Sequence, residues 1–475
     1  MRHGLFIDGG WVDPAGGAHF ATIDPATEEP IAEIARGGAA DVDRAVRAAD
    51  AAMKGPWSRL APAERGALLF KLADVIAAHR DELARLETLD VGKPLKDSLG
   101  DVDGVVTTLR YNAGAADKMQ GETIPLGPDV VDFTLLEPLG VTAHIVPWNF
   151  PLGIAIRSLA PALAAGCTAV LKPAEQSSLS ALKLAELLPE AGFPQGVLNV
   201  VTGYGEEAGE ALVRHPLVRG ITFTGSVETG RKILAAAAPG IRPVVLELGG
   251  KNPMIVFADA DLDRAVADAL AGSFENCGQV CSSSSRYLLE PAIREDFLGL
   301  LSAKAETLKV GPGLDNPDIG PIVSSEQYEK VTGYVARGSA DGARLRTGGN
   351  RPQHLQRGYF IAPTIFDRVD PSAAIAREEI FGPVGVALDI SGEDQAVDLA
   401  NGLGYGLAAG IYTSDISRAL RLARRIQAGS IWINGWWMGG VQAPTGGMKD
   451  SGIGRERGLA GIRNYLQIKN VAIRL

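Results

Sequence analysis

Cysteine is scarce in this sequence, with Cys167, Cys277 and Cys281 the three in a chain of 475 residues. Three cysteines cannot form the disulfide framework of a chain this long, and so few thiols suit a reducing compartment, which predicts a cytoplasmic protein. Cys277 and Cys281 lie four positions apart without a second pair of cysteine or histidine residues nearby. We therefore expect no structural zinc site and no other metal centre.

The sequence also lacks an excess of basic charge and a long apolar run. Its formal net charge is −10 at pH 7, which argues against a general nucleic-acid partner, because such a partner requires a basic face. No uncharged apolar segment has membrane-spanning length, and residues 1–8 lack the apolar core of a signal peptide. With 46% hydrophobic and 21% charged residues, the composition predicts an ordinary soluble globular protein without a membrane partner.

Strand-like and helical patterns alternate through the middle of the chain. Helical patterns separate most of five short apolar runs, which lie at 141–146, 168–172, 197–201, 220–224 and 244–248. This alternation predicts a parallel, doubly wound sheet, and five strands fit one nucleotide-binding unit of the Rossmann type. After Gly249-Gly250 a second alternating unit begins at 254–257 and continues to about 431–434. A chain of this length is also expected to form two or three domains.

The flanking segments predict further helices and two isolated strands. Before the alternating region we expect amphipathic helices at 42–53 and 62–89, the second beginning at Pro62, which suits a first helical turn. Residues 130–137 predict an isolated strand, and the tail, 465–475, alternates like an edge strand.

The stretch from Ser273 to Ser285 contains two of the three cysteines and is a candidate for covalent chemistry. A helical pattern precedes it, Gly278 permits a tight turn, and a strand-like run follows at 286–289. The thiol of Cys281 is therefore expected at a bend among small residues, which suits a covalent nucleophile that needs room for its substrate. A buried and inert cysteine is the alternative for any single cysteine.

Two further side chains stand at positions that suit acyl chemistry. Glu247 lies in the apolar run 244–248, where burial disfavours its anion and raises its pKa toward that of a general base near neutral pH. Asn149, in the rigid turn Pro147-Trp148-Asn149-Phe150-Pro151, has an amide that can donate to a developing oxyanion. The alternatives are a glutamate paired with a lysine and a surface turn around a buried tryptophan.

Small and charged residues at strand ends are candidates for a dinucleotide site. Gly225 and Ser226 close the fourth strand of the unit and precede a helix, whose N-terminus offers free N–H groups to a pyrophosphate. Lys172 and Glu175 follow the second strand, where a carboxylate can accept both ribose hydroxyls and repel a 2′-phosphate. This favours NAD over NADP as the cofactor. The alternatives are an ordinary turn glycine and a solvated pair of charges.

Seven motifs in this sequence resemble those of the aldehyde dehydrogenase superfamily, in the family's order and at its spacing across essentially the whole chain. They are P-W-N-F-P at 147–151, K-P-A-E at 172–175, F-T-G-S at 223–226, L-E-L-G-G-K at 246–251, N-x-G-Q-x-C at 276–281, E-E-I-F-G-P-V at 378–384 and S-G-x-G-R-E at 451–456. One such motif is weak evidence, whereas seven in order are very specific.

The resemblance implies NAD-dependent oxidation of an aldehyde to a carboxylic acid. It makes Cys281, not Cys277, the nucleophile, with the oxyanion held by the Asn149 side chain and the Cys281 backbone N–H. Glu247 would activate the water that hydrolyses the thioester, and Glu456 matches a second acid that serves either in proton relay or in structure. The cofactor residues that it implies are Lys172 and Glu175 at the adenosine ribose, Glu379 at the nicotinamide ribose, Phe381 near the nicotinamide, Ser226 at the pyrophosphate, and also Gly225 and Trp148.

The fold that the resemblance implies is an α/β architecture with a Rossmann-type doubly wound cofactor domain, a second α/β catalytic domain and a small β oligomerisation arm. On this chain the NAD-binding domain would comprise 1–120 and 139–249, the catalytic domain 250–448, and the arm 121–138 and 449–475. The isolated strand and the tail would pair within the arm, because alone they would be open edges. A homodimer or homotetramer is then expected.

Two other functions remain open at this point. A CoA-acylating semialdehyde dehydrogenase passes its acyl group to a thiol instead of water, but those branches usually lack a glutamate at the position of Glu247. A non-catalytic relative kept as a binding or structural protein, such as a crystallin, is disfavoured by the intact Cys281, Glu247 and Asn149.

The family's aldehyde tunnel indicates which residues contact the substrate, and its walls correspond here to Phe150, Arg157, Glu275, Trp436 and Trp437. An arginine at position 157 resembles the succinic-semialdehyde branch, but Glu275 has the opposite charge to the arginine found there. Either Arg157 binds an acidic or hydroxylated aldehyde, or it pairs with Glu275 and leaves a neutral, aromatic-lined tunnel. We favour the pair, because an unpaired buried charge is costly, and expect a medium-sized neutral or aromatic aldehyde.

Overall fold

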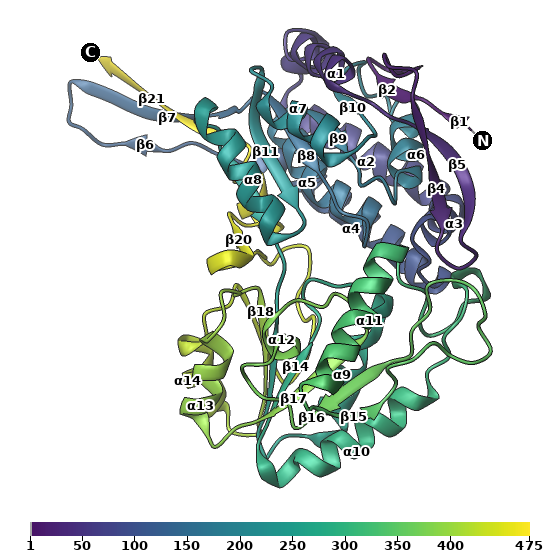
Figure 1. Cartoon of the computed structure of the whole chain (residues 1–475). Helices are drawn as coiled ribbons and strands as arrows, with labels where there is room; N and C mark the ends of the chain where they lie inside the picture. Colours follow the sequence, from purple (N-terminus) through teal and green to yellow (C-terminus); the bar gives the residue numbers. More distant parts are fainter. Residues whose placement is uncertain (1) are drawn as a thin grey trace.

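The computed structural model describes residues 2–475 and shows two bodies built on separate sheets, with a narrow arm projecting from one of them (Figure 1). The first body, at the top of the view, contains most of the N-terminal half of the chain. The second body, below it, contains most of the C-terminal half. The arm extends to the upper left and ends at the C-terminus. The predicted α/β fold class is confirmed.

The first body is built on an eight-stranded sheet in the order β20-β12-β11-β8-β9-β10-β2-β3. Its five central strands are parallel and match the predicted runs: β8 (Val141–Ile145), β9 (Thr168–Lys172), β10 (Leu198–Val200), β11 (Val218–Thr224) and β12 (Val244–Glu247). The strand order reverses between β8 and β11, and open α/β sheets bind ligands at such a switch point. Three outer strands pair antiparallel: β2 (Leu5–Ile7), β3 (Gly10–Val12) and β20 (Gly452–Ile453).

Helices of the first body enclose two apolar clusters, one against each face of this sheet. One cluster includes side chains of α2 (Pro62–Ala78), α3 (Arg80–Val91), α4 (Leu95–Ala115), α5 (Pro151–Ala165) and α6 (Leu179–Leu187). The other includes side chains of α1 (Ala39–Ala52), α7 (Glu210–Arg214) and α8 (Val227–Ala237).

The sequence prediction for the N-terminal helices is wrong in two respects. The single helix expected at 62–89 is two helices, because His79 leaves the helical conformation with φ −100° and ψ 20°. The 21-residue helix α4 was not predicted, since it contains Gly100, Gly104 and Gly114, and glycine disfavours an isolated helix. Packing of α4 against α2 and α5 overrides that propensity.

The second body is built on a seven-stranded sheet in the order β15-β16-β17-β14-β13-β18-β19. The strands are parallel except at the edge pair β15–β16: β13 (Pro253–Val256), β14 (Arg286–Leu289), β15 (Arg344–Thr347), β16 (Thr364–Asp367), β17 (Val384–Asp389), β18 (Ala408–Tyr412) and β19 (Ser430–Ile433). Its helices are α9 (Leu262–Phe274), α10 (Pro291–Thr307), α11 (Ser325–Ala340), α12 (Ala374–Arg377), α13 (Glu393–Asn401) and α14 (Ile416–Arg425). The second alternating unit is therefore present.

The arm joins the isolated strand to the C-terminal tail. Strand β21 (Leu466–Arg474) pairs antiparallel with β7 (Val130–Pro138), which also pairs with β6 (Thr123–Ile124). Strand β20 and the short helix α15 (Gly458–Arg463) differ from the predicted arm: β20 pairs with β12 and α15 packs on α5. A small sheet of β1 (Arg2–His3), β4 (His19–Asp24) and β5 (Glu29–Ala35) completes the first body.

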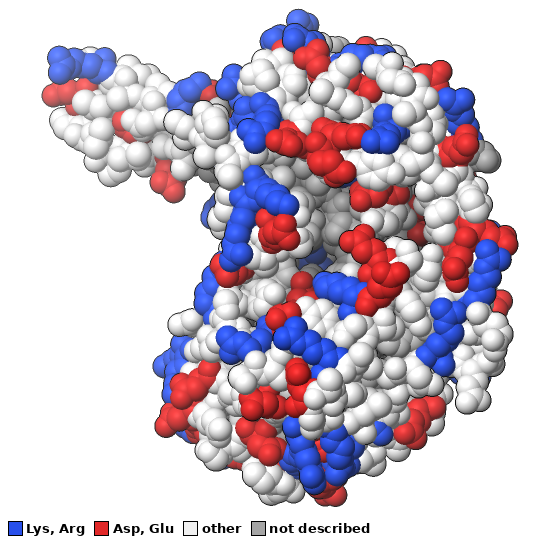
Figure 2. All heavy atoms as spheres, viewed as in Figure 1, with Lys and Arg blue, Asp and Glu red and all other residues white. Residues whose placement is uncertain are grey.

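The space between the two bodies positions the functional residues. Figure 2 shows that this face of the molecule is hollowed between them, with acidic and basic side chains along the rim. Loops from the carboxyl ends of the first sheet and the loop after α9 converge there. No helix of residues 2–475 is long and apolar enough to cross a membrane.

Candidate active site

The nucleophile segment is a strained loop between α9 and β14. Asn276, Cys277 and Gly278 have φ angles of 48°, 56° and 67°, so three successive residues adopt the left-handed conformation. A Cβ on Gly278 would lie 2.2 Å from the carbonyl oxygen of Gly382, which explains why glycine stands there. Such strain persists only where surrounding contacts hold it, and it concentrates at functional sites. The loop directs Cys281 toward charged groups of the first body.

The three cysteines differ in their access to solvent. Cys281 is partly exposed, whereas Cys167 and Cys277 are buried. Burial raises the pKa of the Cys281 thiol to about 11, and the guanidinium of Arg157 opposes that rise. Burial raises the pKa of Cys277 further, and its side chain belongs to the core of the second body. Cys281 is therefore the thiol that a substrate can reach.

Asn149 is fixed by hydrogen bonds that cross from the first body to the nucleophile loop. Its Nδ2 donates to the carbonyl oxygen of Gln279 at 2.9 Å, and its backbone carbonyl accepts from Asn276 Nδ2 at 2.9 Å. Gln279 also donates to the carbonyl oxygen of Asn276 at 3.1 Å and accepts from the backbone N–H of Val323 at 3.0 Å. A carboxamide nitrogen has two protons, so Asn149 has a second one to offer an oxyanion.

Glu247 is the last residue of β12 and is 6% exposed. Among residues 2–475, no hydrogen-bond donor reaches its Oε1. Burial raises the pKa of Glu247 to about 8, and the neighbouring charge of Glu456 adds to the rise. Space for this carboxyl depends on Gly446, where a Cβ would lie 2.6 Å from Glu247 Oε1. A carboxyl with such a pKa can accept a proton from water slightly above neutral pH.

Arg157, on α5, forms its ion pair with Glu456. The predicted pair between Arg157 and Glu275 is therefore wrong. Glu456 follows β20, and the pairing of β20 with β12 brings it beside Glu247, a contact between distant segments that sequence spacing does not reveal. Burial lowers the pKa of Arg157, but the charges of Glu456, Glu247 and Cys281 outweigh that effect and raise it.

Glu275 lies among acidic side chains of α4. Burial raises the pKa of Glu275 to about 7, Asp97 and Asp101 raise it further, and Lys93 opposes them. The residue is nevertheless exposed, so solvent reaches its carboxyl although nearby protein atoms weaken its hydration. This acidic cluster, formed by Asp97, Asp101 and Glu275, thus holds more carboxyl groups than cations.

The first group of predicted cofactor residues lies at the end of β11. The hydroxyl of Ser226 accepts a hydrogen bond from the backbone N–H of Thr229 at 3.2 Å and so caps α8. Gly225 donates its N–H to the carbonyl oxygen of Glu247 at 3.0 Å. A Cβ on Gly225 would lie 2.4 Å from the ring of Phe223, so glycine keeps this turn open. Helix α8 has 11 residues and begins at the switch point of the sheet, so the free N–H groups of its first turn suit a pyrophosphate.

The second group lies at the end of β9, on the other side of β8. Lys172 is 3% exposed, and its Nζ donates to the carbonyl oxygen of Pro173 at 2.9 Å. The carboxylate of Glu175 lies 3.8 Å from that Nζ and is one-third exposed. Together with Ser226 these side chains flank the switch point, so the residues present fit a dinucleotide.

The third group joins the two bodies. The rings of Trp148 and Phe381 meet edge to face, with centroids 5.3 Å apart. Phe381 has a left-handed backbone with φ 59°. The Oε1 of Glu379 accepts from the backbone N–H of Gly250 at 2.9 Å, and a Cβ on Gly249 would lie 2.2 Å from its other oxygen. Three motifs that are distant in sequence therefore converge here.

Comparisons with known proteins agree with this arrangement. The model of the aldehyde dehydrogenase family matches residues 11–471. The chain belongs to this family. A hydroxyisobutyraldehyde dehydrogenase of Mycolicibacterium austroafricanum is 47% identical over 473 residues, which cover 99% of this chain and 94% of that protein. Betaine aldehyde dehydrogenase 1 of Oryza sativa subsp. japonica is 46% identical over 479 residues, which cover 99% and 95%.

A solved structure extends the comparison to the fold. The NAD+ complex of an aldehyde dehydrogenase from Bacillus cereus matches with a TM-score of 0.98 and 43% identity, over 100% of this chain and 97% of that one. The family resemblance predicted from the seven motifs is confirmed. As a member of this family, the enzyme is an oxidoreductase that acts on aldehydes.

The predicted tunnel residues of this aldehyde dehydrogenase have different environments. Trp436 and Trp437 both hold Ser282, the residue after Cys281, through their indole Nε1 atoms at 3.2 Å and 2.9 Å. Trp436 is 8% exposed and packs in the core of the second body, so it supports the loop from inside. Trp437 and Phe150 are partly exposed, and they remain the candidates for a tunnel wall.

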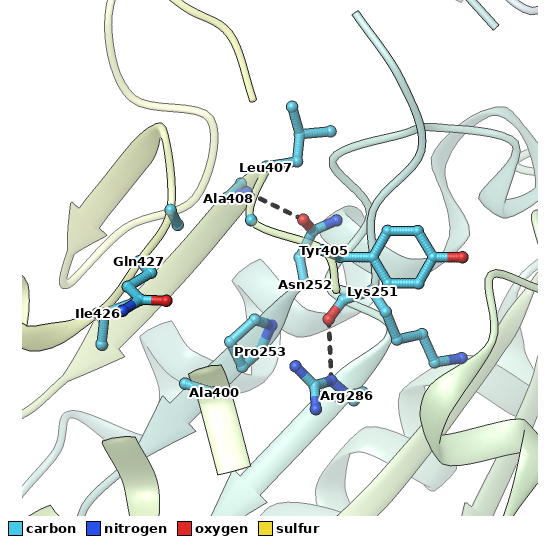
Figure 3. A pocket seen from close by; sticks show the side chains of 12 residues that line it. Lys251, Asn252, Pro253, Arg286, Ala400, Tyr405, Leu407, Ala408, Ile426 and Gln427 are labelled. Atoms are coloured by element: carbon cyan, nitrogen blue, oxygen red, sulfur yellow. Dashed lines mark hydrogen bonds between the residues drawn. The ribbon is translucent and has the colours of Figure 1, made fainter. Parts of the chain in front are cut away.

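Sequence reasoning missed the residues that hold the nucleophile loop from behind. Asn252 Nδ2 donates to the carbonyl oxygens of Cys281 and Ser283, each at 2.8 Å. Its Oδ1 accepts from the Ala408 N–H at 3.0 Å (Figure 3). Asn252 and Arg286 line a cavity of about 10 Å³, room for one water-sized group, which lies apart from Cys281. The only signal in the sequence was that Asn252 directly follows L-E-L-G-G-K.

Proposed function

We propose that this enzyme oxidises an aldehyde to the carboxylic acid through a thioester on Cys281, which water hydrolyses. The observation that supports this most is the meeting of a reachable thiol with an unpartnered buried carboxyl, Glu247, which is close enough to influence its pKa. The fixed amide of Asn149 supplies the third group. Nucleophile, base and oxyanion donor are the parts that acyl transfer through a thioester requires.

The reaction begins when Cys281 releases its proton to solvent and its thiolate attacks the aldehyde carbon. The carbonyl oxygen becomes an alkoxide, which the Asn149 Nδ2 and the Cys281 backbone N–H stabilise. When bound, NAD supplies the acceptor for the hydride that leaves this carbon. The acyl group then remains on the sulfur as a thioester. Glu247 takes a proton from water, the hydroxide displaces the thiolate, and the acid is released.

The preference for NAD over NADP is also part of the proposal. Glu175 follows β9, and its carboxylate lies 3.8 Å from the Lys172 ammonium. A carboxylate there accepts the ribose hydroxyls and repels a 2′-phosphate. Lys172, Glu175, Ser226 and Glu379 are the residues that we assign to the dinucleotide, with Gly225, Trp148 and Phe381 beside them.

The substrate that the acidic cluster favours is an aldehyde with a positive charge. Asp97, Asp101 and Glu275 form this cluster, and among the groups of residues 2–475 that act on Glu275 the one cation is Lys93. Such a site attracts an ammonium group. The neutral aldehyde expected from the sequence depended on a pair between Arg157 and Glu275, which the structure contradicts. One similar protein is named for betaine aldehyde, which is such a cation.

The assembly and compartment are proposed on two observations. Strand β21 lies at the edge of the arm and exposes Ile468 and Ile473, with exposed fractions of 74% and 46%. A second copy of this chain that packs against β21 would cover the open strand edge and its apolar side chains. We therefore propose a homodimer or homotetramer. The cysteines are free, and the chemistry needs a reduced thiol at Cys281, which fits the cytoplasm.

The test is NADH absorbance after mixing the purified protein with NAD and an aldehyde, with and without CoA. We expect NADH and free acid without CoA, no product from Cys281→Ala, and nearly full activity from Cys277→Ala. An acyl-CoA product with activity that depends on CoA would favour the thiol-transfer reaction. No NADH from any aldehyde would indicate a non-catalytic relative, and an active Cys281→Ala would refute the assigned nucleophile.

A further inference from the structure

A buried lysine of the first body lies against the turn that contains Asn149. Lys93 stands in the turn between α3 and α4, outside the seven motifs, and is 1% exposed. Its Nζ lies 3.9 Å from the centroid of the Phe150 ring and 3.1 Å from Glu87 Oε1, and it also contacts the carboxylate of Asp101. A desolvated cation over an aromatic face attracts the ring and fixes its position.

The carboxylate partner of Lys93 also holds the start of α5. Glu87 is 1% exposed, and its Oε2 accepts from the backbone N–H of Leu152 at 3.4 Å. Phe150 and Leu152 are therefore both tied to the ion pair, one through its ring and the other through its backbone. Because Asn149 directly precedes Phe150, the same contacts restrict where its amide can lie.

The turn that contains Lys93 also packs on the second body. Gly92, with φ 80°, would place a Cβ 2.3 Å from the ring of Pro321. A Cβ on Gly313 would lie 2.4 Å from the carbonyl oxygen of Lys93, and one on Gly320 would lie 2.1 Å from that of Gly92. The backbone of this turn therefore contacts the backbone of the second body directly. A side chain larger than that of glycine at any of these three positions would force the two backbones apart.

This contact leads directly to the nucleophile loop. The carbonyl oxygen of Pro321 accepts from Gln279 Nε2 at 3.5 Å. The backbone carbonyl of Gln279 is the acceptor for Asn149 Nδ2. The turn at Lys93 thus reaches the Asn149 amide from two sides, through Phe150 in the first body and through Gln279 in the second.

We propose that Lys93 is a positioning residue for the oxyanion hole, which holds the Phe150 ring and thereby keeps the Asn149 amide in register with Cys281. The inference rests on the proposed function, in which that amide stabilises the alkoxide. A purely structural role for the ion pair would weaken the fold but would act independently of Asn149. The two roles are separated by a double-mutant cycle.

The test variant is Lys93→Met combined with Glu87→Gln. It removes the cation and its fully buried anion together, and the glutamine still accepts from Leu152, so the carboxylate that loses its cation is that of Asp101, which solvent reaches. Phe150→Leu is a second variant, which removes the ring and leaves the ion pair in place. Lys183→Met is the matched control, because Lys183 also pairs with two carboxylates but lies on α6.

The readout is the rate of NADH formation in a single turnover, with NAD affinity measured separately. We expect the Lys93/Glu87 variant to slow this step about 10- to 100-fold, as a misplaced catalytic group does, with the NAD Kd within about twofold. In an Asn149→Ala background, already slowed about 100-fold or more, the same change should cost less than about threefold further. Lys183→Met should match the wild type.

Equal losses in the presence and absence of the Asn149 amide would overturn the proposal, as would an unchanged rate in the Lys93/Glu87 variant. If that variant does not fold, Phe150→Leu in both backgrounds decides by the same criterion. The proposed function fails in a different way: the wild type would then produce no NADH, or Cys281→Ala would remain active.

Discussion

The guanidinium of Arg157 pairs with the carboxylate of Glu456 in the buried space beside Glu247. Arg157 interacts there with three acidic groups, because Glu247 and Cys281 raise the pKa of its guanidinium together with Glu456. Arg157 is therefore committed to the enzyme's own groups and is not free to hold a substrate carboxylate. Its position instead favours the ionised form of the Cys281 thiol, which is the nucleophilic form.

Replacing Arg157 with glutamine should make the Cys281 thiol harder to ionise. Loss of the cation removes the largest influence that lowers the pKa of this thiol. A rise of about one pKa unit reduces the thiolate about tenfold at a pH below the pKa. Alkylation by iodoacetamide, followed from pH 7 to 10 in a Cys277→Ala background, should therefore shift to higher pH.

Arg455→Gln is the matched control for that experiment. Arg455 lowers the pKa of Glu247 but is not among the main influences on Cys281. Its alkylation profile should coincide with that of the parent. An Arg157→Gln profile that also coincides would show that the guanidinium does not act on the thiol.

The base assignment predicts a specific dependence on pH. Because burial raises the pKa of Glu247 to about 8, the carboxyl is neutral below that pH and a base above it. Thioester hydrolysis should therefore accelerate from about pH 7 to 9 and then level off. Glu247→Gln should lose this rise, accumulate acyl-enzyme and hydrolyse it about a hundredfold more slowly. Quenched-flow detection of acyl-enzyme measures this, and unimpaired hydrolysis would refute the role.

The sequence predicted the parts of this fold that local patterns determine. Five runs with strand composition became five parallel strands, and the alternation with helices indicated their parallel direction but not their order in the sheet. The nucleophile loop was also expected, because Gly278 ends a helical pattern. Helix α4 was missed, since three glycines conceal a helix that only tertiary packing stabilises.

Pairing between distant charges could not be predicted from the sequence. Arg157 was placed opposite Glu275 by analogy of position, yet β20 brings Glu456 to it across 299 positions of chain. Lys93 and Asn252 were missed for the same reason, because neither lies within a motif and each acts through contacts made on folding. The spacing of residues along the chain shows which side chains share one face of a helix or strand. It does not show which charged side chains pair in the folded interior.

The preference for NAD should depend on Glu175. In Glu175→Gln the carboxylate that repels a 2′-phosphate is gone, while Lys172 remains nearby to attract it. Allowing for partial exposure and screening by solvent, we expect the ratio of kcat/KM for NAD over NADP to fall about tenfold. Glu210→Gln on α7 is the control, since that glutamate pairs with Arg214. An unchanged ratio would remove Glu175 from the discrimination.

Recognition of a cationic aldehyde should depend on pH and on Glu275. The pKa of Glu275 is raised to about 7, so its carboxyl is largely neutral at pH 6 and charged at pH 8. The KM for betaine aldehyde should therefore fall as pH rises through this range. The KM for benzaldehyde, which is neutral, should not follow it. Glu275→Gln should abolish the difference.

The size of that effect is limited because Glu275 is exposed. A screened ion pair contributes up to about 1 kcal/mol, so we expect roughly a fivefold change in KM, which should shrink at high salt. Glu306→Gln on α10, also exposed, should behave as the wild type. Succinic semialdehyde preferred by a wide margin, with that preference lost in Arg157→Ala, would instead show that the arginine serves the substrate. In that case the acidic cluster would not select the aldehyde.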